Sequence, residues 1–151
     1  MNSPDAHFRR LEKDEAARLY QHLCSTWSIR EHCWWPLSGD RPAHAECFQD
    51  HYFAHELGEE SLRRILTAHG VTHLYEHREG GESYELSVSS FEPHYNGLEG
   101  FWSDKNLDWI IYASHESSIT VGGEWLLNEI KTVWPQWQQR IWTTPFFERP
   151  Q

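Results

Sequence analysis

Residues 108–123, DWIIYASHESSITVGG, constrain the fold more than any other stretch of the chain. An almost unbroken apolar run at 109–113 is followed by Ser-His-Glu-Ser and by a second β-forming run at 119–121. A run without polar alternation predicts a strand in the interior of a sheet. We therefore expect strands at 107–114 and 118–122, a hairpin connection between them, and a helix after Gly122 and Gly123.

Ser114, His115 and Glu116 also have the residue types of a catalytic triad. A triad needs the three groups to converge, with serine bonded to histidine and the acid on the far ring nitrogen. Consecutive residues of a strand point to opposite faces, and the chain has no GxSxG elbow. We therefore expect His115 and Glu116 to stabilise the turn or to contact a partner, and we expect no catalytic residue here.

The remaining sequence predicts helices at 13–27, 58–70 and 124–134, with one more helical turn after Pro135, and a hairpin across 71–91. Residues 46–57 are ambiguous between helix and strand, and 28–45 and 92–106 are expected to be loops. The predicted fold is α+β: an antiparallel sheet of about four strands, with three or four helices packed mainly on one face. The length of 151 residues predicts a single domain, with a lead-in at 1–12 and a tail at 143–151.

The net charge of −10 restricts the choice of partner. An acidic surface disfavours nucleic-acid phosphates and anionic membranes and favours a basic protein. Only 38% of the residues are hydrophobic, but they include nine tryptophans, six tyrosines and seven phenylalanines, each of which buries a large area. We therefore expect a folded core together with some surface aromatic residues.

The three cysteines, Cys24, Cys33 and Cys47, form no CxxC pair. The first twenty residues are polar, and no apolar run has the length of a membrane span. These features predict a cytoplasmic protein with free thiols. Glycine-rich phosphate loops and dinucleotide fingerprints are also missing, so we expect no cofactor.

Histidines offer an alternative function. His51 and His55 would share one face of a helix and could bind zinc with a third ligand such as His44 or Glu56, although the glutamate of HExxH is missing. The alternative is a metal-dependent or acid–base enzyme with His51, His55 and His115 as ligands and Glu56 or Glu116 as general base. The competing interpretation of His51 and His55 is a polar helix face without metal.

Aromatic residues in the predicted loops are candidate interface anchors, because exposed tryptophan and tyrosine dominate many binding interfaces. The competing interpretation is that they cover the edge of the core. A homodimer formed through an exposed sheet edge is a further alternative. The predicted partner-binding residues are Trp34, Trp35, Tyr95, Phe101, Trp102, Asp104, His115 and Glu116.

The stretches SLRRILTAHGVTHLYEHREG and FEPHYNGLEGFWSDKNLDWIIYASHESSITVGG, followed by a helix ending in Trp-Pro, carry a resemblance. Residues 58–135 resemble a group of small, poorly characterised bacterial proteins with a DWxxYxSHExSxTxGG core. The resemblance implies an immunity protein of a polymorphic toxin system, which would bind a basic toxin domain, and it implies no catalytic residue. The matching positions are Glu99, Trp102, Asp108, Trp109, His115 and Glu116.

Overall fold

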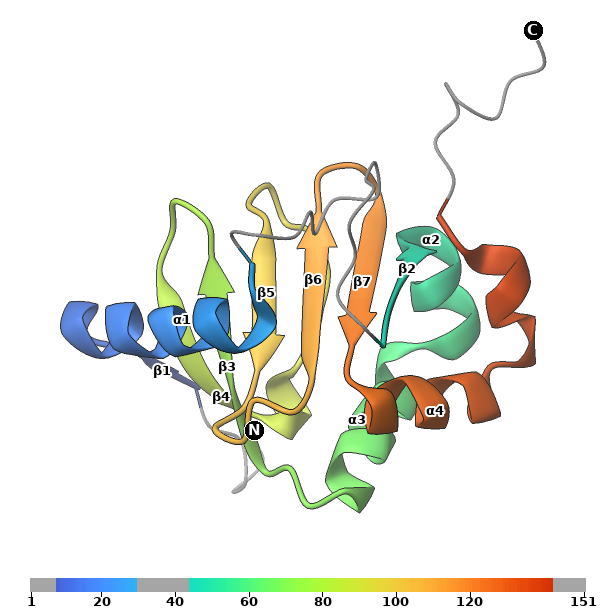
Figure 1. Ribbon diagram of the computed structural model, residues 1–151, viewed down its shortest axis with the longest axis horizontal. Coiled ribbons are helices and arrows are strands. Elements are labelled where there is room, and N and C mark those ends of the chain that lie inside the picture. The colour runs from blue at the N-terminus through green and yellow to red at the C-terminus, as the bar shows by residue number, and fades with distance from the viewer. Residues whose placement is uncertain (1–7, 30–43, 143–151) are drawn as a thin grey trace, which may run out of the picture.

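The computed structural model describes residues 8–29 and 44–142 (Figure 1). Their strands form one antiparallel sheet of seven strands, in the order β1-β4-β3-β5-β6-β7-β2. The strands are β1 (Phe8–Arg10), β2 (Ala45–Gln49), β3 (His73–Arg78), β4 (Ser83–Ser87), β5 (Gly100–Ser103), β6 (Ile110–Ser114) and β7 (Ser118–Gly122).

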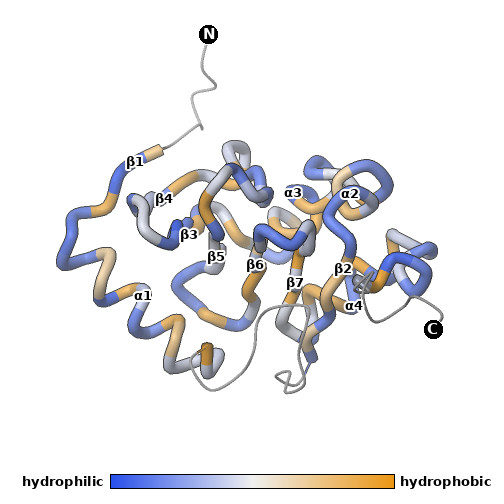
Figure 2. The backbone as a smooth tube through the Cα atoms, turned by 90° about the horizontal axis from the view of Figure 1, so that it is seen from above, coloured by the Kyte–Doolittle hydropathy of each residue, from blue (hydrophilic) through white to orange (hydrophobic). Residues whose placement is uncertain are grey.

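Helices cover both faces of this sheet. Figure 2 shows α1 on one side of the row of strands and α2 and α3 on the other. The helices are α1 (Lys13–Trp27), α2 (Asp50–Tyr52), which continues as the π-helical turn η1 (Phe53–Leu57), α3 (Glu59–Ala68) and α4 (Glu124–Val133), with short 3-10 turns η2 (Val88–Ser90) and η3 (Pro135–Arg140).

The interior strands supply apolar side chains to both faces, and this explains the two helical layers. Trp102 and Ile111 belong to the larger core cluster, which includes α3 and α4 residues, whereas Phe101 and Tyr112 pack with Leu23 of α1. Successive side chains of a strand point to opposite faces, so an unbroken apolar strand is stable only between two covering layers.

The predicted sheet of about four strands with helices mainly on one face is therefore wrong. The sheet has seven strands, and the prediction missed three of them. β1 lies in the predicted lead-in, and β5 lies in the predicted loop 92–106. β2 covers the last residue of the predicted loop 28–45 and the first four residues of the ambiguous segment 46–57. The helices predicted at 13–27, 58–70 and 124–134, the hairpin β3–β4 and the hairpin β6–β7 are confirmed.

None of the helices in residues 8–29 and 44–142 has the length and apolar character needed to cross a membrane. Cys24 and Cys47 are both buried, and they form no disulfide bond within the described residues. Cys33, Trp34, Trp35 and the predicted tail 143–151 lie outside the described residues.

Gly123 makes the junction between β7 and α4 possible. Its φ of 115° is in the region that L-residues avoid, and an added Cβ would lie 2.6 Å from the backbone oxygen of Asp108 and 3.0 Å from Cα of Trp109. The helix therefore starts close against the residues that lead into β6, and this packing requires a residue without a side chain.

We expect Gly123→Ala to lower the free energy of unfolding by about 3 kcal/mol, because it combines backbone strain with overlap against backbone atoms. Gly70→Ala is the matched control: its φ is 92°, but nothing lies within 4 Å of the added Cβ. Its expected cost is about 1 kcal/mol, from backbone strain alone. Urea denaturation of both variants measures the difference, and equal losses would contradict the close approach at Gly123.

Candidate functional site

Acidic side chains gather at one end of the sheet, where strand register brings distant segments together. Arg78 pairs with Gly100, Gly100 with Ala113, and Gln49 with Ser118. The residues just beyond these pairs therefore lie at one end, which we call the acidic end. They are Glu79, Glu99, His115, Glu116 and Asp50.

His115 links two of these carboxylates. Its Nδ1 lies 2.6 Å from Oε2 of Glu99, and its backbone N–H donates to the same oxygen at 3.1 Å. Its Nε2 lies 3.3 Å from Oε1 of Glu116. The His115 side chain is 55% exposed, while those of Glu99 and Glu116 are 12% and 19% exposed. The imidazole therefore lies at the surface and is bound by the less exposed carboxylate of Glu99.

The charges of this cluster stabilise one another. The hydrogen bond to Glu99, supported by the charges of Glu99, Glu116 and Glu79, raises the pKa of His115 above its ordinary value. Partial burial alone would raise the pKa of Glu99, but hydrogen bonds from Tyr112 and from the backbone and ring of His115 outweigh it and lower that pKa. Burial raises the pKa of Tyr112, so its hydroxyl stays protonated and donates to Glu99.

The turn between β6 and β7 is built by serines. The hydroxyl oxygens of Ser114 and Ser118 are 2.6 Å apart in a buried position, and the N–H of Glu116 donates to the Ser114 hydroxyl oxygen at 3.1 Å. Ser117 has a φ of 61°, as expected for the last residue of a three-residue hairpin loop. Ser114 thus stabilises the turn, while His115 binds Glu99; the three consecutive residues do not form a charge relay.

Arg78 holds the loop 92–99 against the sheet. Its Nη1 donates to the carbonyl oxygens of His94 and Leu98 at 3.0 and 3.1 Å, and its Nε donates to Oε2 of Glu76 at 3.2 Å. Oε1 of Glu76 accepts a bond from the indole nitrogen of Trp102 at 2.9 Å. The Arg78 and Glu76 side chains are 6% and 14% exposed. A buried guanidinium that donates three hydrogen bonds thus holds this loop at His94 and at Leu98.

The fixed loop exposes two apolar side chains beside the acidic end. Tyr95 is 38% exposed and Leu98 is 41% exposed. Both precede Glu99 in the chain, so apolar surface lies next to the Glu99–His115–Glu116 cluster. An aromatic residue presented by a rigid loop loses little conformational entropy on binding, which is the usual property of an interface anchor.

The structure brings some of the predicted partner-binding residues to this surface and buries others. Tyr95, His115 and Glu116 lie at or beside the acidic end. Phe101, Trp102 and Asp104 are only 6%, 0% and 4% exposed and therefore do not belong to the exposed surface. The two aromatic residues fill the core on opposite faces of β5, and the Asp104 carboxylate accepts the N–H of Asn106.

The structure does not bring the predicted metal ligands together in one place. His51 and His55 do share one face, with ring centroids 4.5 Å apart, and His44 lies near Glu124. Glu56 accepts bonds from Arg140 and from Trp134. Among the described residues, the group of three with potential ligand atoms within 4.8 Å of one another is Glu99, His115 and Glu116, without His51 or His55.

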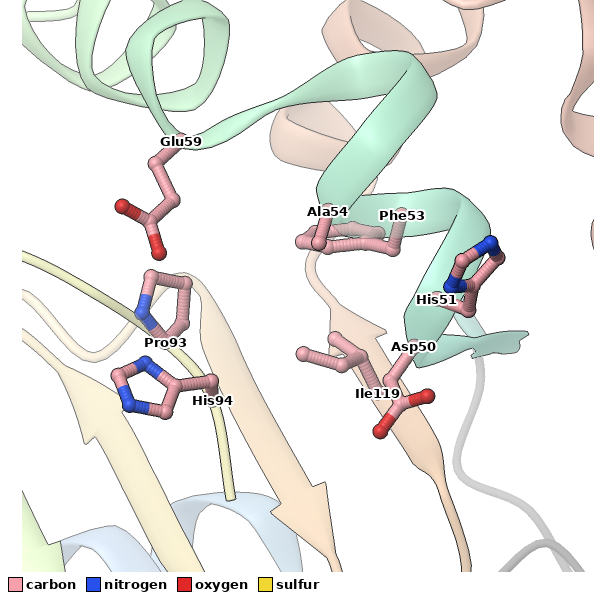
Figure 3. A pocket seen from close by; sticks show the side chains of 8 residues that line it. All are labelled: Asp50, His51, Phe53, Ala54, Glu59, Pro93, His94 and Ile119. Atoms are coloured by element: carbon pink, nitrogen blue, oxygen red, sulfur yellow. The ribbon is translucent and has the colours of Figure 1, made fainter. Parts of the chain in front are cut away.

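A pocket of about 240 Å³ opens next to the acidic end (Figure 3). In the figure, Glu59, Pro93 and His94 lie on one side, and Phe53, Ile119 and Asp50 lie on the other. The N–H of Asp50 donates to the carbonyl oxygen of Ser117, which connects the pocket wall to the β6–β7 turn. The pocket and the acidic end are therefore parts of one surface.

Sequence reasoning missed Glu76 and Arg78 as organising residues and did not pair Glu99 with His115. The only sequence signal for the first pair is two charges of opposite sign, at 76 and 78, within a predicted strand. Residues spaced by two lie on the same face of a strand, so this spacing indicates that the pair is shared by one face.

Comparison of the chain with protein-family models, with curated proteins and with solved structures gives no match.

We expect Arg78→Met to lower the free energy of unfolding by about 3–5 kcal/mol, because it leaves the Glu76 carboxylate buried without its partner. Adding Glu76→Gln removes that charge and should recover at least about 1 kcal/mol. Hydrogen exchange of the amides in 94–99 should also accelerate in the single variant. Arg64→Met, which breaks an exposed pair with Glu60, is the control and should cost less than about 0.5 kcal/mol. A cost for Arg78→Met as small as the control would contradict its anchoring role.

We expect the stabilising contribution of His115 to depend on pH. Since the folded state raises its pKa, the contribution is complete below the ordinary value of about 6.5 and is lost as the pH rises through the folded pKa. It also falls at acid pH, when Glu99, whose pKa is lowered, becomes protonated.

The measurement is the difference in unfolding free energy between the wild type and His115→Gln as a function of pH, with exposed His22→Gln as the control. Burial lowers the pKa of His77 to about 4. All three proteins contain His77, so its contribution cancels in the difference in unfolding free energy. A difference for His115→Gln that does not change between weakly acidic and alkaline pH would contradict the ion pair.

Proposed function

We propose that the protein is an immunity-type inhibitor that acts in the cytoplasm and neutralises a cognate bacterial toxin by direct contact through the acidic end. The observation that carries the proposal is that Tyr95 and Leu98 are exposed on a loop fixed by Arg78, beside the Glu99–His115–Glu116 cluster. Apolar anchors give affinity, and the surrounding carboxylates select a basic partner.

The overall charge supports the same proposal. With a net charge of −10, the protein attracts a basic domain, such as a nuclease, at long range and accelerates association. Residues 58–135 resemble a group of small, poorly characterised bacterial proteins, and the immunity protein that this resemblance implies agrees with the acidic charge. The arrangement of Ser114, His115 and Glu116, by contrast, stabilises a turn.

The proposal is tested by coexpressing the protein with the toxin domain encoded by the neighbouring gene. We expect a 1:1 complex, rescue of growth, and an association rate that falls as salt is added. Tyr95→Ala should weaken binding by about 30-fold (about 2 kcal/mol), because it removes the central anchor. Val133→Ala, at an exposed position of α4, is the matched control and should leave affinity unchanged. Failure to bind or to rescue would refute the proposal, as would wild-type affinity in Tyr95→Ala.

A metal-dependent enzyme is the second candidate, and one observation favours it. The potential ligand atoms of Glu99, His115 and Glu116 lie within 4.8 Å of one another. If this group binds a divalent ion, zinc should raise the melting temperature of the wild type but not of His115→Gln. Elemental analysis of the purified protein is the second measurement. An unchanged melting temperature at about 1 mM zinc would remove this candidate.

A further inference from the structure

The pocket of Figure 3 has the size of a single side chain. Its volume is about 240 Å³, below the range of roughly 300–1,000 Å³ that is usual for cofactors and small-molecule ligands. It opens on the same surface as the loop 92–99, which contributes His94 and also carries Tyr95 and Leu98. A partner that binds the loop 92–99 therefore binds next to the pocket.

The pocket combines an apolar floor with acidic margins. Phe53, Ile119 and Pro93 provide apolar surface, and Glu59 and Asp50 stand at separate positions on its wall (Figure 3). An arginine side chain has the same two parts: an aliphatic stem, and a planar guanidinium that stacks on rings and pairs with carboxylates.

The carboxylates around the pocket outnumber the cationic side chains that pair with them. Arg63 lies 3.3 Å from a carboxylate oxygen of Glu59 and 3.9 Å from one of Glu92, and it donates to the carbonyl oxygen of Phe91. One guanidinium therefore serves two carboxylates. Asp50 makes no side-chain hydrogen bond or ion pair within the part of the chain that the structure describes, so its charge is not compensated there.

We propose that this pocket receives an arginine side chain of the basic protein partner, with the stem on Phe53 and Ile119 and the guanidinium at Asp50. This inference rests on the proposed function for the identity of the partner. Lysine fits less well, because its compact, strongly hydrated ammonium neither stacks on a ring nor forms two parallel bonds to a carboxylate. A neutral side chain of the same shape would leave Asp50 unpaired.

The test uses the full chain and blocked tripeptides, Gly-Arg-Gly, Gly-citrulline-Gly and Gly-Lys-Gly, in titrations followed by amide NMR signals. Citrulline has nearly the shape of arginine without its charge, and lysine has the charge without the planar fork. We expect the arginine peptide to shift the signals of Asp50, Phe53, Ala54, His94 and Ile119, with a dissociation constant on the order of 1–10 mM. The citrulline and lysine peptides should bind at least about fivefold more weakly.

Asp50→Asn should weaken binding of the arginine peptide by at least about fivefold. Asp108→Asn, which removes an exposed carboxylate at the opposite end of the sheet, is the matched control and should leave binding unchanged. Thermal unfolding of both variants checks that they remain folded.

Equal binding of the three peptides, shifts outside the pocket only, or unchanged binding in Asp50→Asn would each overturn the inference. The titration needs no toxin, so its outcome is independent of the proposed function. Peptide binding without a toxin partner would support the arginine pocket and refute the inhibitor, whereas a toxin complex without peptide binding would do the reverse.

Discussion

The buried ion pair of Arg78 and Glu76 is the interaction on which the order of the acidic end depends. A charge inside a protein is tolerated only when its hydrogen bonds are satisfied. Here the guanidinium donates to Glu76 and to two loop carbonyls and lies 4.7 Å from the centre of the Trp102 ring, while the Glu76 carboxylate accepts the Trp102 indole. Two of these partners are carbonyl oxygens of the loop 92–99. The hydrogen bonds that satisfy the buried Arg78 charge therefore also fix the loop.

Two further contacts connect the fixed loop 92–99 with the β6–β7 turn and the β6–β7 turn with Asp50. Glu99, directly after the fixed loop, binds the ring and backbone of His115, and the carbonyl of Ser117 accepts the N–H of Asp50. Three chain segments that are distant in sequence are therefore connected by polar bonds at one end. A binding surface composed of such segments changes shape little on association, which reduces the entropy lost when a partner binds.

The sequence was sufficient for the elements with strong periodicity. The helices at 13–27 and 58–70 and both hairpins follow from apolar spacing and glycine positions. Strand β5 was hidden because its four residues lie in a glycine- and aromatic-rich stretch, and β1 because Phe8–Arg10 is short and exposed. The apolar run at 109–113 already required cover on both faces of the sheet. The Glu99–His115 pair depends on strand register, which no local pattern specifies.

The charges of the acidic end affect both the folding stability of the protein and the proposed binding of a basic partner. The charges of Glu99, Glu116 and Glu79 favour the protonated form of His115, so its charge compensates theirs only while it is protonated. At a net charge of −10, carboxylates gathered at one end of the protein add to its self-repulsion in the folded state. Basic groups of a partner would remove the same repulsion on binding. The proposed association would therefore offset a cost in stability that the free protein bears.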